Sequence, residues 1–260
     1  LYLRRCTPEQ FSYLRVVLTG AEKLPLRLVQ AFQDKFGITP VEGYGVTECA
    51  PVISSNCPDF RASGFYQVAS RRGTVGQPFP GVSVRIVDPE TWTILPPGQA
   101  GMLLVKGPNI MSGYLGREDL TAKAMKDGWY ITGDIATLDE DGFLTITDRL
   151  SRFSKIGGEM VPHGKVEEAL QQAAEAEMQV FAVTGLPDEK KGERLAVLHT
   201  LDEGSIPEIL DKLAAGGLPN LFIPARNQFV KVEALPILGT GKLDLRGVKR
   251  IATERLMPAS

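Results

Sequence analysis

Hydrophobic positions change their spacing twice along the chain, and this predicts three successive segments of different structure. In the first segment, residues 14–18 (LRVVL) form a short apolar run that predicts a buried strand. Pro25 is placed to open a helix and Gly37 to end it. Four apolar residues recur between them at helical spacing: Leu28, Val29, Phe32 and Phe36. A second extended run follows, so the order strand–helix–strand predicts part of an α/β layer.

From about residue 75 to residue 150 the pattern becomes one of short apolar or alternating runs. These runs are VSVRIVD, GMLLVKG and GFLTITD, at residues 82–88, 101–107 and 142–148. Segments rich in Gly, Pro and Asp separate them, as is typical of turns between strands. The segment is therefore expected to form a small, mostly antiparallel sheet or barrel.

The remaining segment predicts a compact α+β domain of about a hundred residues. Val166 and Leu170 begin the apolar face of a helix that extends towards Met178, and residues 179–185 and 194–200 read as strands. A capping box at Ser205 predicts the start of another helix. Residues 246–256 predict a terminal helix. A polar link at 148–154 places the domain boundary, with 1–150 in one domain and 151–260 in the other.

Composition narrows the functional classes. The 29 basic and 31 acidic side chains give a net charge of −2, so nucleic acid is not an expected partner. The three cysteines form no C-x-x-C pair, and with only two histidines a zinc site is not expected. Free thiols are typical of a reducing cytoplasm. His163 and His199 are expected to be surface or strand residues and not metal ligands.

Two short motifs combine glycine with a carboxylate. In YGVTE, residues 44–48, Glu48 could bind Mg²⁺ and Thr47 could bond a phosphate oxygen, whereas the simpler alternative is a solvated turn. In YITGD, residues 130–134, Asp134 could accept both hydroxyls of a ribose, whereas the alternative is an ordinary hairpin turn. The strand and loop of residues 101–114 are read as packing.

The segment GTGK, residues 239–242, is not a phosphate-binding P-loop. Lys242 is followed by Leu243 and not by Ser or Thr, and Pro236 stands where that motif requires its first glycine. What remains is a lysine on a glycine turn, which suits a mobile point charge directed at an anion.

Seven segments in this order resemble the adenylate-forming superfamily of acyl-CoA synthetases, peptide-synthetase adenylation domains and luciferases. They are TGAEKLP, YGVTE, VGQPFPGVSVRIVD, GMLLVKGPNIMSGY, YITGD, DRLSRFSKIGGE and LGTGKLDL. The segments SKIGGEMVPHGKVEEAL and NQFVKVEALPILGTGKLDLRGVK look most like the acyl-acyl-carrier-protein synthetase part of bifunctional 2-acylglycerophosphoethanolamine acyltransferases. The resemblance implies an α/β plus α+β fold: the end of a large adenylation domain with a small barrel-like subdomain, then a mobile α+β domain.

The resemblance also implies roles for single residues in the large domain. Gly20, Ala21 and Glu22 match the adenine-side turn. Tyr44, Gly45 and Thr47 would border the adenine and the α-phosphate of ATP or AMP. Glu48 would bind Mg²⁺, and Asp134 would hold the ribose hydroxyls.

At the end of the first domain, the resemblance implies that Arg149 assists Asp134 in holding the ribose. The remaining roles belong to the second domain. Ser151 falls at the hinge, where family members usually carry Asp or Lys. Gly157 and Gly158 would border the thiol channel. Lys242 matches the lysine that contacts the carboxylate and the α-phosphate during adenylation, so Lys242, Thr47 and Glu48 are the catalytic candidates.

The implied activity is ATP-dependent activation of a fatty acid to acyl-AMP, followed by transfer to the thiol of acyl carrier protein, with coenzyme A as the alternative acceptor. The family's T-S-G-T-T-G-x-P-K loop, which holds the β- and γ-phosphates, is not found in the sequence. The chain is therefore expected to be the C-terminal part of a larger synthetase and inactive by itself, or a nucleotide- or carrier-binding module. The resemblance implies a cytoplasmic protein, with a parent at the cytoplasmic face of the inner membrane as the alternative.

Overall fold

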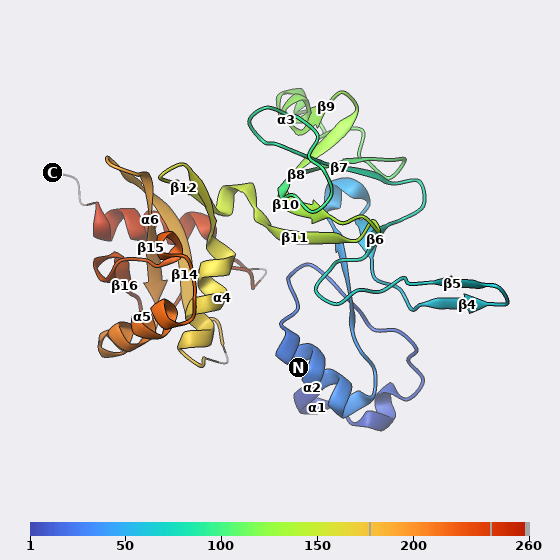
Figure 1. The fold of residues 1–260 in the computed structure, drawn as a ribbon, viewed down its shortest axis with the longest axis horizontal. Helices are drawn as coiled ribbons and strands as arrows, with labels where there is room; N and C mark the ends of the chain where they lie inside the picture. Colours follow the sequence, from blue (N-terminus) through green and yellow to red (C-terminus); the bar gives the residue numbers. More distant parts are fainter. Residues whose placement is uncertain (177, 240, 258–260) are drawn as a thin grey trace. The chain divides into compact units, whose positions relative to one another are not determined.

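The computed structural model describes residues 1–176, 178–239 and 241–257, and it divides into two compact units (Figure 1). The first unit is Leu1–Thr147 and the second is Asp148–Ser260. The predicted boundary after residue 150 lies close to this division. Within the units, the structure contains the α/β layer, the antiparallel sheet and the α+β domain that the sequence predicts.

The first unit begins with the α/β layer. Its helical elements are α1 (Tyr2–Arg5), η1 (Pro8–Phe11), α2 (Leu26–Phe36) and η2 (Thr47–Cys49), and its strands are β1 (Leu18–Thr19), β2 (Val41–Gly45), β3 (Val52–Ser55) and β6 (Gln77–Pro78). The sheet order is β1-β2-β3-β6; β1 is parallel to β2, and the other pairs are antiparallel. Helix α2 ends at Gly37 with φ +70°, as predicted.

Two details of this layer differ from the prediction. Most of residues 14–18 lie outside any strand, because β1 contains only Leu18 and Thr19. The face of α2 that packs inwards carries Phe32 and Phe36, which meet Phe11, whereas Leu28 is exposed. The buried stripe is thus narrower than the helical periodicity suggests.

The β-rich part of the first unit forms a five-stranded sheet in the order β11-β10-β8-β7, with β9 also paired to β10. Its elements are β7 (Ser83–Val87), β8 (Gly101–Lys106), α3 (Glu118–Ala124), β9 (Met125–Lys126), β10 (Trp129–Leu138) and β11 (Leu144–Arg149). The pairing of β10 with β8 shifts register between Ile131 and Ile135. YITGD therefore lies at an irregularity inside a strand and not at a hairpin turn. Such bulges redirect side chains.

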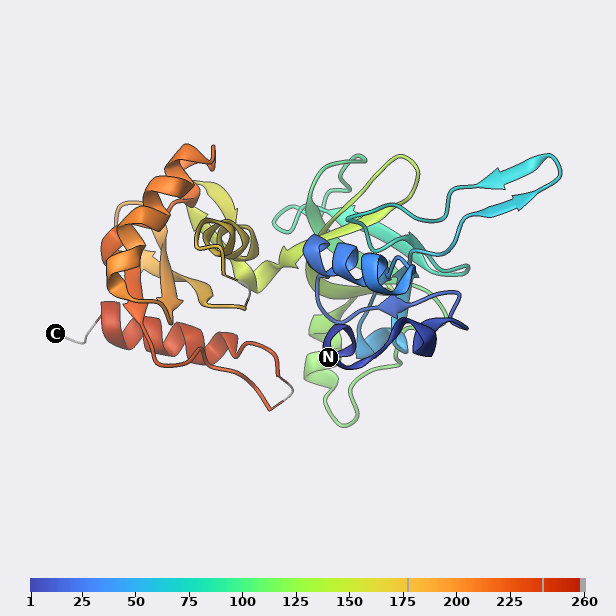
Figure 2. The ribbon, with the colours of Figure 1, turned by 90° about the horizontal axis from the view of Figure 1, so that it is seen from below.

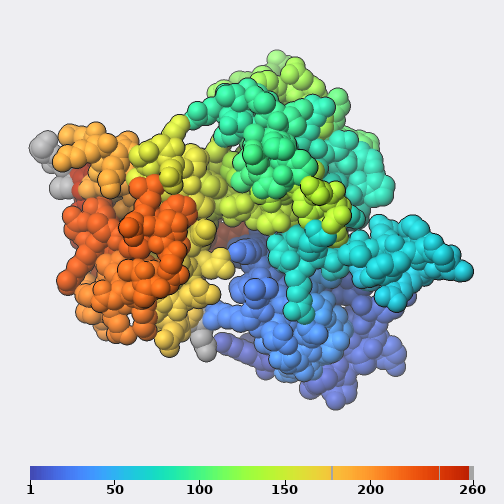
Figure 3. Space-filling view, in the orientation of Figure 1, coloured from blue at the N-terminus to red at the C-terminus, as the bar shows by residue number. Residues whose placement is uncertain are grey.

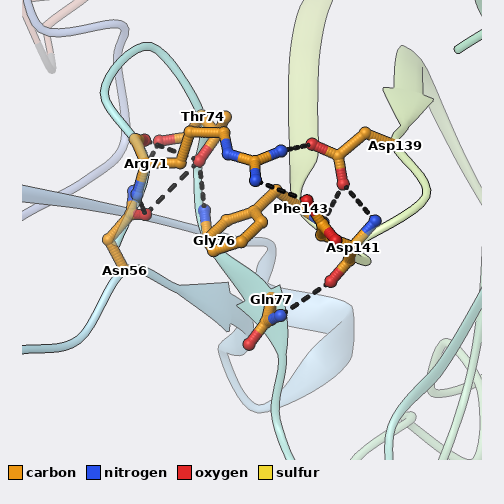
Figure 4. Close-up of polar contacts among 8 residues, drawn as sticks. All are labelled: Asn56, Arg71, Thr74, Gly76, Gln77, Asp139, Asp141 and Phe143. Carbon is orange, nitrogen blue, oxygen red and sulfur yellow. Dashed lines mark hydrogen bonds and ion pairs between the residues drawn. The ribbon is translucent and has the colours of Figure 1, made fainter. Parts of the chain in front are cut away.

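A polar network joins the two sheets of the first unit (Figure 4). The guanidinium group of Arg71 donates to the carboxylates of Asp139 and Asp141 and lies over the ring of Phe143. Asn56 Oδ1 accepts from the backbone N–H of Arg71 at 2.9 Å. The long connection before β6 is thereby fixed against the turn between β10 and β11.

A hairpin of β4 (Phe60–Ala62) and β5 (Phe65–Gln67) extends from the first unit as a separate two-stranded ribbon (Figures 1 and 3). Phe60, Phe65 and Tyr66 on this hairpin are about half exposed. The Tyr66 hydroxyl donates to Asp59 Oδ2 at 2.8 Å.

The second unit is built on the sheet β13-β12-β15-β14, with β16 paired in parallel to β15. Its strands are β12 (Phe153–Ile156), β13 (Glu159–Pro162), β14 (Phe181–Asp188), β15 (Gly192–His199) and β16 (Phe229–Lys231). Its helices are η3 (Leu150–Arg152), α4 (His163–Ala173), η4 (Glu203–Ser205), α5 (Ile206–Ala215), η5 (Asn220–Phe222), η6 (Arg226–Gln228) and α6 (Leu245–Leu256).

Alternation along β14 gives this sheet two apolar faces. Phe181 and Val183 face a core that includes residues of α4 and α5, whereas Ala182 and Leu186 face a core that includes Val248 of α6. Helices α4 and α5 therefore cover one face and α6 covers the other (Figures 1 and 2).

Three expectations for the second unit are wrong in whole or in part. Helix α5 begins directly after Ser205, as predicted, but the capping box does not form, because the Ser205 hydroxyl donates to the carbonyl of Asp202, the residue before η4. Met178 lies beyond the end of α4 and is exposed. His163 is buried at the start of α4, so it is neither a surface nor a strand residue, whereas His199 is the last residue of β15 and is a buried strand residue. Among the described residues, no helix has the length and apolar character required to cross a membrane.

Candidate functional site

The two carboxylate motifs of the first unit meet through Tyr44 and Asp134. Tyr44 lies near the end of β2, and Asp134 lies in the irregular part of β10. The Tyr44 hydroxyl donates to Oδ2 of Asp134, a carboxylate that is almost fully buried. Burial, and then the negative charge of Asp134, raise the pKa of Tyr44 far above its ordinary value. The phenol therefore stays protonated, and able to donate, to a higher pH than an ordinary tyrosine does.

The position of Asp134 is set by its own strand. Its backbone N–H donates to Thr132 Oγ1 at 3.0 Å, and the Thr132 hydroxyl donates to the carbonyl of Leu103 on β8 at 2.9 Å. These bonds hold the backbone of Asp134 where the pairing with β8 is irregular, and the Tyr44 hydroxyl holds its carboxylate.

Gly45 follows Tyr44 at a point where β2 and β3 come close together. A Cβ atom at this position would lie 1.9 Å from the carbonyl oxygen of Pro51, so no side chain fits. The pairing of β2 with β3 also shifts register between Tyr44 and Gly45. The glycine in YGVTE therefore has a packing reason that is independent of any ligand.

Thr47 and Glu48 lie in the 3₁₀ turn η2, directly after β2. Thr47 is exposed, and Glu48 is partly buried. The Tyr114 hydroxyl donates to Glu48 Oε1 at 2.7 Å. This hydrogen bond raises the pKa of Tyr114, with burial adding to the effect.

A loop on the far side of η2 holds this turn in place. Asn109 Nδ2 donates to the carbonyls of Cys49 at 2.8 Å and Val52 at 3.1 Å, and the backbone N–H of Met111 donates to the carbonyl of Glu48 at 2.8 Å. The sequence reading treated residues 101–114 as packing and so missed Asn109 and Tyr114. The signal that could have identified them is the group of polar residues immediately after a buried strand, where ligand-binding loops often lie.

Gly20, Ala21 and Glu22 form the turn after β1. Because β1 and β2 are adjacent and parallel, this turn lies on the same edge of the sheet as η2. Ala21 has φ +74°, a left-handed conformation that is uncommon outside glycine, and Glu22 is exposed. The structure thus brings together Gly20–Glu22, Tyr44–Glu48 and, through Tyr44, Asp134.

The donor set around Glu48 suits Mg²⁺ better than a metal held by protein alone. No group of three or more His, Cys, Asp or Glu side chains that could hold a metal occurs in the described part of the chain. Mg²⁺ is usually bound through one or two carboxylates, with water and substrate phosphates completing its coordination. A single carboxylate beside an exposed threonine fits this pattern.

The other predicted residues belong to the second unit. Ser151 is exposed in η3, next to Arg152, whose side chain is held in an ion cluster. Arg152 Nη2 lies 2.5 Å from Glu167 Oε2, and Arg152 Nε lies 3.6 Å from Asp148 Oδ1. The backbone N–H of Gly164 donates to Asp148 Oδ2 at 2.8 Å. The residues on both sides of Ser151 are thus anchored to α4. Arg149 begins this segment, and its backbone N–H donates to Asp148 Oδ1 at 2.8 Å.

Gly157 and Gly158 form the turn between β12 and β13. Their φ angles are +59° and +92°, and a Cβ atom at either position would meet nothing within 4 Å. The exposed turn leaves open space beside the backbone, as the predicted role in a thiol channel requires, but that role stays a prediction.

Lys242 lies in a tight loop that precedes α6 and extends from the second unit (Figure 2). The backbone N–H of Leu238 donates to the carbonyl of Lys242 at 2.7 Å, and that of Gly241 donates to the carbonyl of Leu238 at 2.8 Å. Gly241 has φ +86°, and Lys242 is exposed. Thr240 of the GTGK segment lies outside the described residues. The Lys242 side chain is therefore displayed on a glycine-dependent turn, as the sequence indicated.

Comparison with known proteins identifies the family. Residues 3–115 match the model of the AMP-binding enzyme family. The chain is 33% identical over 245 residues to a long-chain-fatty-acid–CoA ligase of Bacillus subtilis (strain 168), covering 94% of this chain and 42% of the relative. It is 36% identical over 234 residues to the ligase of that name from Yersinia pestis, covering 90% and 39%. It is 35% identical over 242 residues to a feruloyl-CoA synthase of an Amycolatopsis species, covering 92% and 46%.

Solved structures show the same architecture. ATP-bound MatB from Rhodopseudomonas palustris superposes with a TM-score of 0.76 at 29% identity, covering 95% of this chain and 47% of that structure. The o-succinylbenzoate CoA synthetase of Bacillus subtilis, in complex with its acyl-adenylate intermediate, gives 0.73 at 27% identity, covering 91% and 46%. The predicted fold class is confirmed. The chain spans less than half the length of each of these proteins.

Proposed function

The chain belongs to the AMP-binding enzyme family, and from this premise we propose that it is the C-terminal part of an ATP-dependent acid–thiol ligase that forms an acyl-adenylate. The observation that carries the proposal is the cluster in the first unit, where Tyr44 contacts Asp134 and Glu48 follows one turn later. Asp134 of β10 is joined through Tyr44 to the end of β2, and Glu48 lies in the turn that follows β2. One carboxylate suited to ribose hydroxyls and one suited to a cation, gathered around the same strand end, fit a nucleotide phosphate ester.

Each residue has a physical task in the proposed reaction. Attack of a carboxylate on ATP brings two anions together, so the developing charge at the α-phosphate has to be neutralised. Lys242 would supply one positive charge, and Mg²⁺ beside Glu48 would supply further positive charge when bound. Thr47 would donate its hydroxyl to a phosphate oxygen, and Asp134 would accept from the ribose hydroxyls.

The roles proposed for the second unit follow from the same reaction. An acyl-adenylate is easily hydrolysed, so a mobile unit that closes over it would exclude water. Lys242 on an exposed turn would act during adenylation, and movement about the segment around Ser151 would then bring Gly157 and Gly158 to the entering thiol. Arg149 would assist Asp134 in holding the ribose.

For the thiol acceptor, we favour coenzyme A over acyl carrier protein. The three curated relatives compared above are CoA ligases or a CoA synthase. For the acid, we favour a long-chain fatty acid, because two of these relatives are long-chain-fatty-acid–CoA ligases. The expected transfer to acyl carrier protein, and the link to a phospholipid acyltransferase, rest on the two segments SKIGGEMVPHGKVEEAL and NQFVKVEALPILGTGKLDLRGVK.

The proposal is tested by measuring AMP release from ATP by the intact parent protein with a long-chain fatty acid and either thiol. We expect AMP release that depends on the fatty acid and on coenzyme A. AMP release with carrier protein but not with coenzyme A would overturn the choice of acceptor. The absence of AMP release with either thiol would overturn the ligase proposal. The isolated 260 residues are expected to give no ATP–pyrophosphate exchange, and robust exchange would contradict that expectation.

A further inference from the structure

Glu48 is held at both its backbone and its side chain by one loop. The backbone N–H of Met111 donates to the carbonyl of Glu48 at 2.8 Å, and the Tyr114 hydroxyl donates to Oε1 of its carboxylate at 2.7 Å. Tyr114 and Glu48 are separated by 66 residues, so this contact depends on the tertiary fold. The loop thus determines where η2 lies and also which way its carboxylate points.

Tyr114 is itself held in place from two directions. Its backbone N–H donates to Thr121 Oγ1 in α3 at 2.9 Å. Its hydroxyl lies close enough to that of Tyr130, a nearly buried residue of β10, for each phenol to affect the pKa of the other. A donor whose backbone is already fixed loses less conformational entropy when it bonds a carboxylate, so the contact constrains Glu48 and not only Tyr114.

We propose that Tyr114 is a positioning residue that orients the Glu48 carboxylate for a divalent cation. This inference rests on the proposed function, because it requires Glu48 to be the cation ligand. Hydrogen bonds from outside the coordination sphere fix the direction of a ligand's lone pairs, and their loss typically weakens metal binding by about 10–100-fold. With Oε1 bonded by Tyr114, the carboxylate cannot rotate freely about its side-chain torsions.

A purely structural role for the same bond makes a different prediction. If Tyr114 only stabilises the loop, its removal lowers the stability of the first unit and leaves cation binding by the folded protein unchanged. The β4–β5 hairpin supplies a matched control, since the Tyr66 hydroxyl donates to the Asp59 carboxylate at 2.8 Å. That pair has the same chemistry and lies on an exposed ribbon apart from Glu48.

The experiment uses Mn²⁺ as a paramagnetic substitute for Mg²⁺ and the 260-residue chain labelled with ¹³C on its six tyrosine rings. Mn²⁺ at Glu48 should broaden the resonances of Tyr114 and Tyr130 before those of Tyr2, Tyr13 and Tyr66. The titration is repeated with Tyr114→Phe, Glu48→Gln and Tyr66→Phe, with Tyr130 as the reporter common to all of them. Thermal unfolding of each variant provides the separate measure of stability.

We expect Glu48→Gln to abolish the broadening at Tyr130, Tyr114→Phe to shift its midpoint to at least about tenfold more Mn²⁺, and Tyr66→Phe to leave it unchanged. A Tyr114→Phe midpoint equal to the wild type, while Glu48→Gln still abolishes binding, would overturn the positioning role and leave the proposed function intact. Broadening that persists in Glu48→Gln, or none in the wild type, would overturn the cation site and the positioning role together.

Discussion

The Tyr44 hydroxyl donates a hydrogen bond to Oδ2 of Asp134, which joins residues 90 positions apart in the chain. One belongs to the α/β layer and the other to the antiparallel sheet. The sequence motifs that contain them are separate, and each is weak alone. Their contact makes them parts of one site, and it implies that a bound ribose would meet a carboxylate whose direction is already set.

Tyr44→Phe is expected to destabilise the first unit, because the nearly buried Asp134 carboxylate loses a donor while the ring is kept. The expected loss is about 1–3 kcal/mol in the free energy of unfolding, measured by urea denaturation. Tyr66→Phe, which removes a hydroxyl from an exposed tyrosine–carboxylate pair, should cost under about 0.5 kcal/mol. Equal losses of unfolding free energy in the two variants would show that the Tyr44 hydrogen bond contributes no more to stability than the exposed Tyr66 hydrogen bond.

Gly45→Ala is expected to destabilise the first unit or prevent its folding, because the added methyl group would overlap the carbonyl of Pro51. Overpacking of this kind typically costs at least about 1–3 kcal/mol. Gly239→Ala is the matched control, since a Cβ atom there meets nothing within 4 Å. Denaturation midpoints that are the same for both variants would contradict the close approach of β2 and β3.

The stability of the second unit should fall between pH 6.5 and pH 4 because of His163. Burial, and then the positive charges of Arg152 and Lys249, lower the pKa of this histidine from 6.5 to about 4. The unfolded chain therefore takes up a proton as the pH drops below 6.5, while the folded state does not until about pH 4. The stability present above pH 6.5 is progressively lost, by roughly 3 kcal/mol in total.

His163→Gln should remove this part of the pH dependence and keep a hydrogen-bonding group near Ser154, which lies 2.8 Å from the histidine Nε2. Asp148 and Glu167, whose pKa values burial raises, act in the opposite direction on acidification and are present in both proteins. The difference between the two pH profiles of unfolding free energy thus reports His163. If the pH profiles of the wild type and His163→Gln run parallel, the loss of stability between pH 6.5 and pH 4 is not due to His163.

In the intact parent, Lys242→Ala should reduce adenylation by at least about 10²-fold, since loss of one group that stabilises transition-state charge commonly has that effect. Thioester formation from supplied acyl-AMP should be largely kept. The two half-reactions are measured separately, as ATP–pyrophosphate exchange and as thioester yield. Lys212→Ala changes an exposed lysine of α5, on the face of the sheet opposite α6, and should affect neither step. An equal loss of both steps in Lys242→Ala would refute the two-step assignment.

Local sequence patterns predicted much of the fold because they reflect local physics. The helix that Gly37 ends and the strands 179–185 and 194–200 have strong periodicity or clear terminators. The strand at 14–18 was overestimated, because an apolar run does not show whether a neighbouring strand is available to pair with it. The buried His163 was missed because burial of a polar ring depends on Arg152 and Ser154, which only the tertiary fold brings near.

For the candidate site, the sequence could identify carboxylates near strand ends but not the residues that orient them. Asp134 and Glu48 stand in recognisable glycine-containing motifs. Tyr114 and Asn109 act across more than 50 residues of sequence, and nothing in their own segment indicates which turn they contact. Such partners are set by long-range packing, so they appear only once the sheets are assembled.

We infer that the Tyr44–Asp134 cluster is the ribose end of a nucleotide site, and calorimetry with AMP can decide this. We expect the 260-residue chain to bind one AMP and to bind 2′-deoxy-AMP at least about tenfold more weakly. Asp134→Asn should weaken AMP binding by a similar factor while its circular dichroism stays unchanged. In Asp134→Asn the difference between AMP and 2′-deoxy-AMP should largely disappear. Equal AMP affinity in the wild type and Asp134→Asn, or no AMP binding by the wild type, would contradict the account.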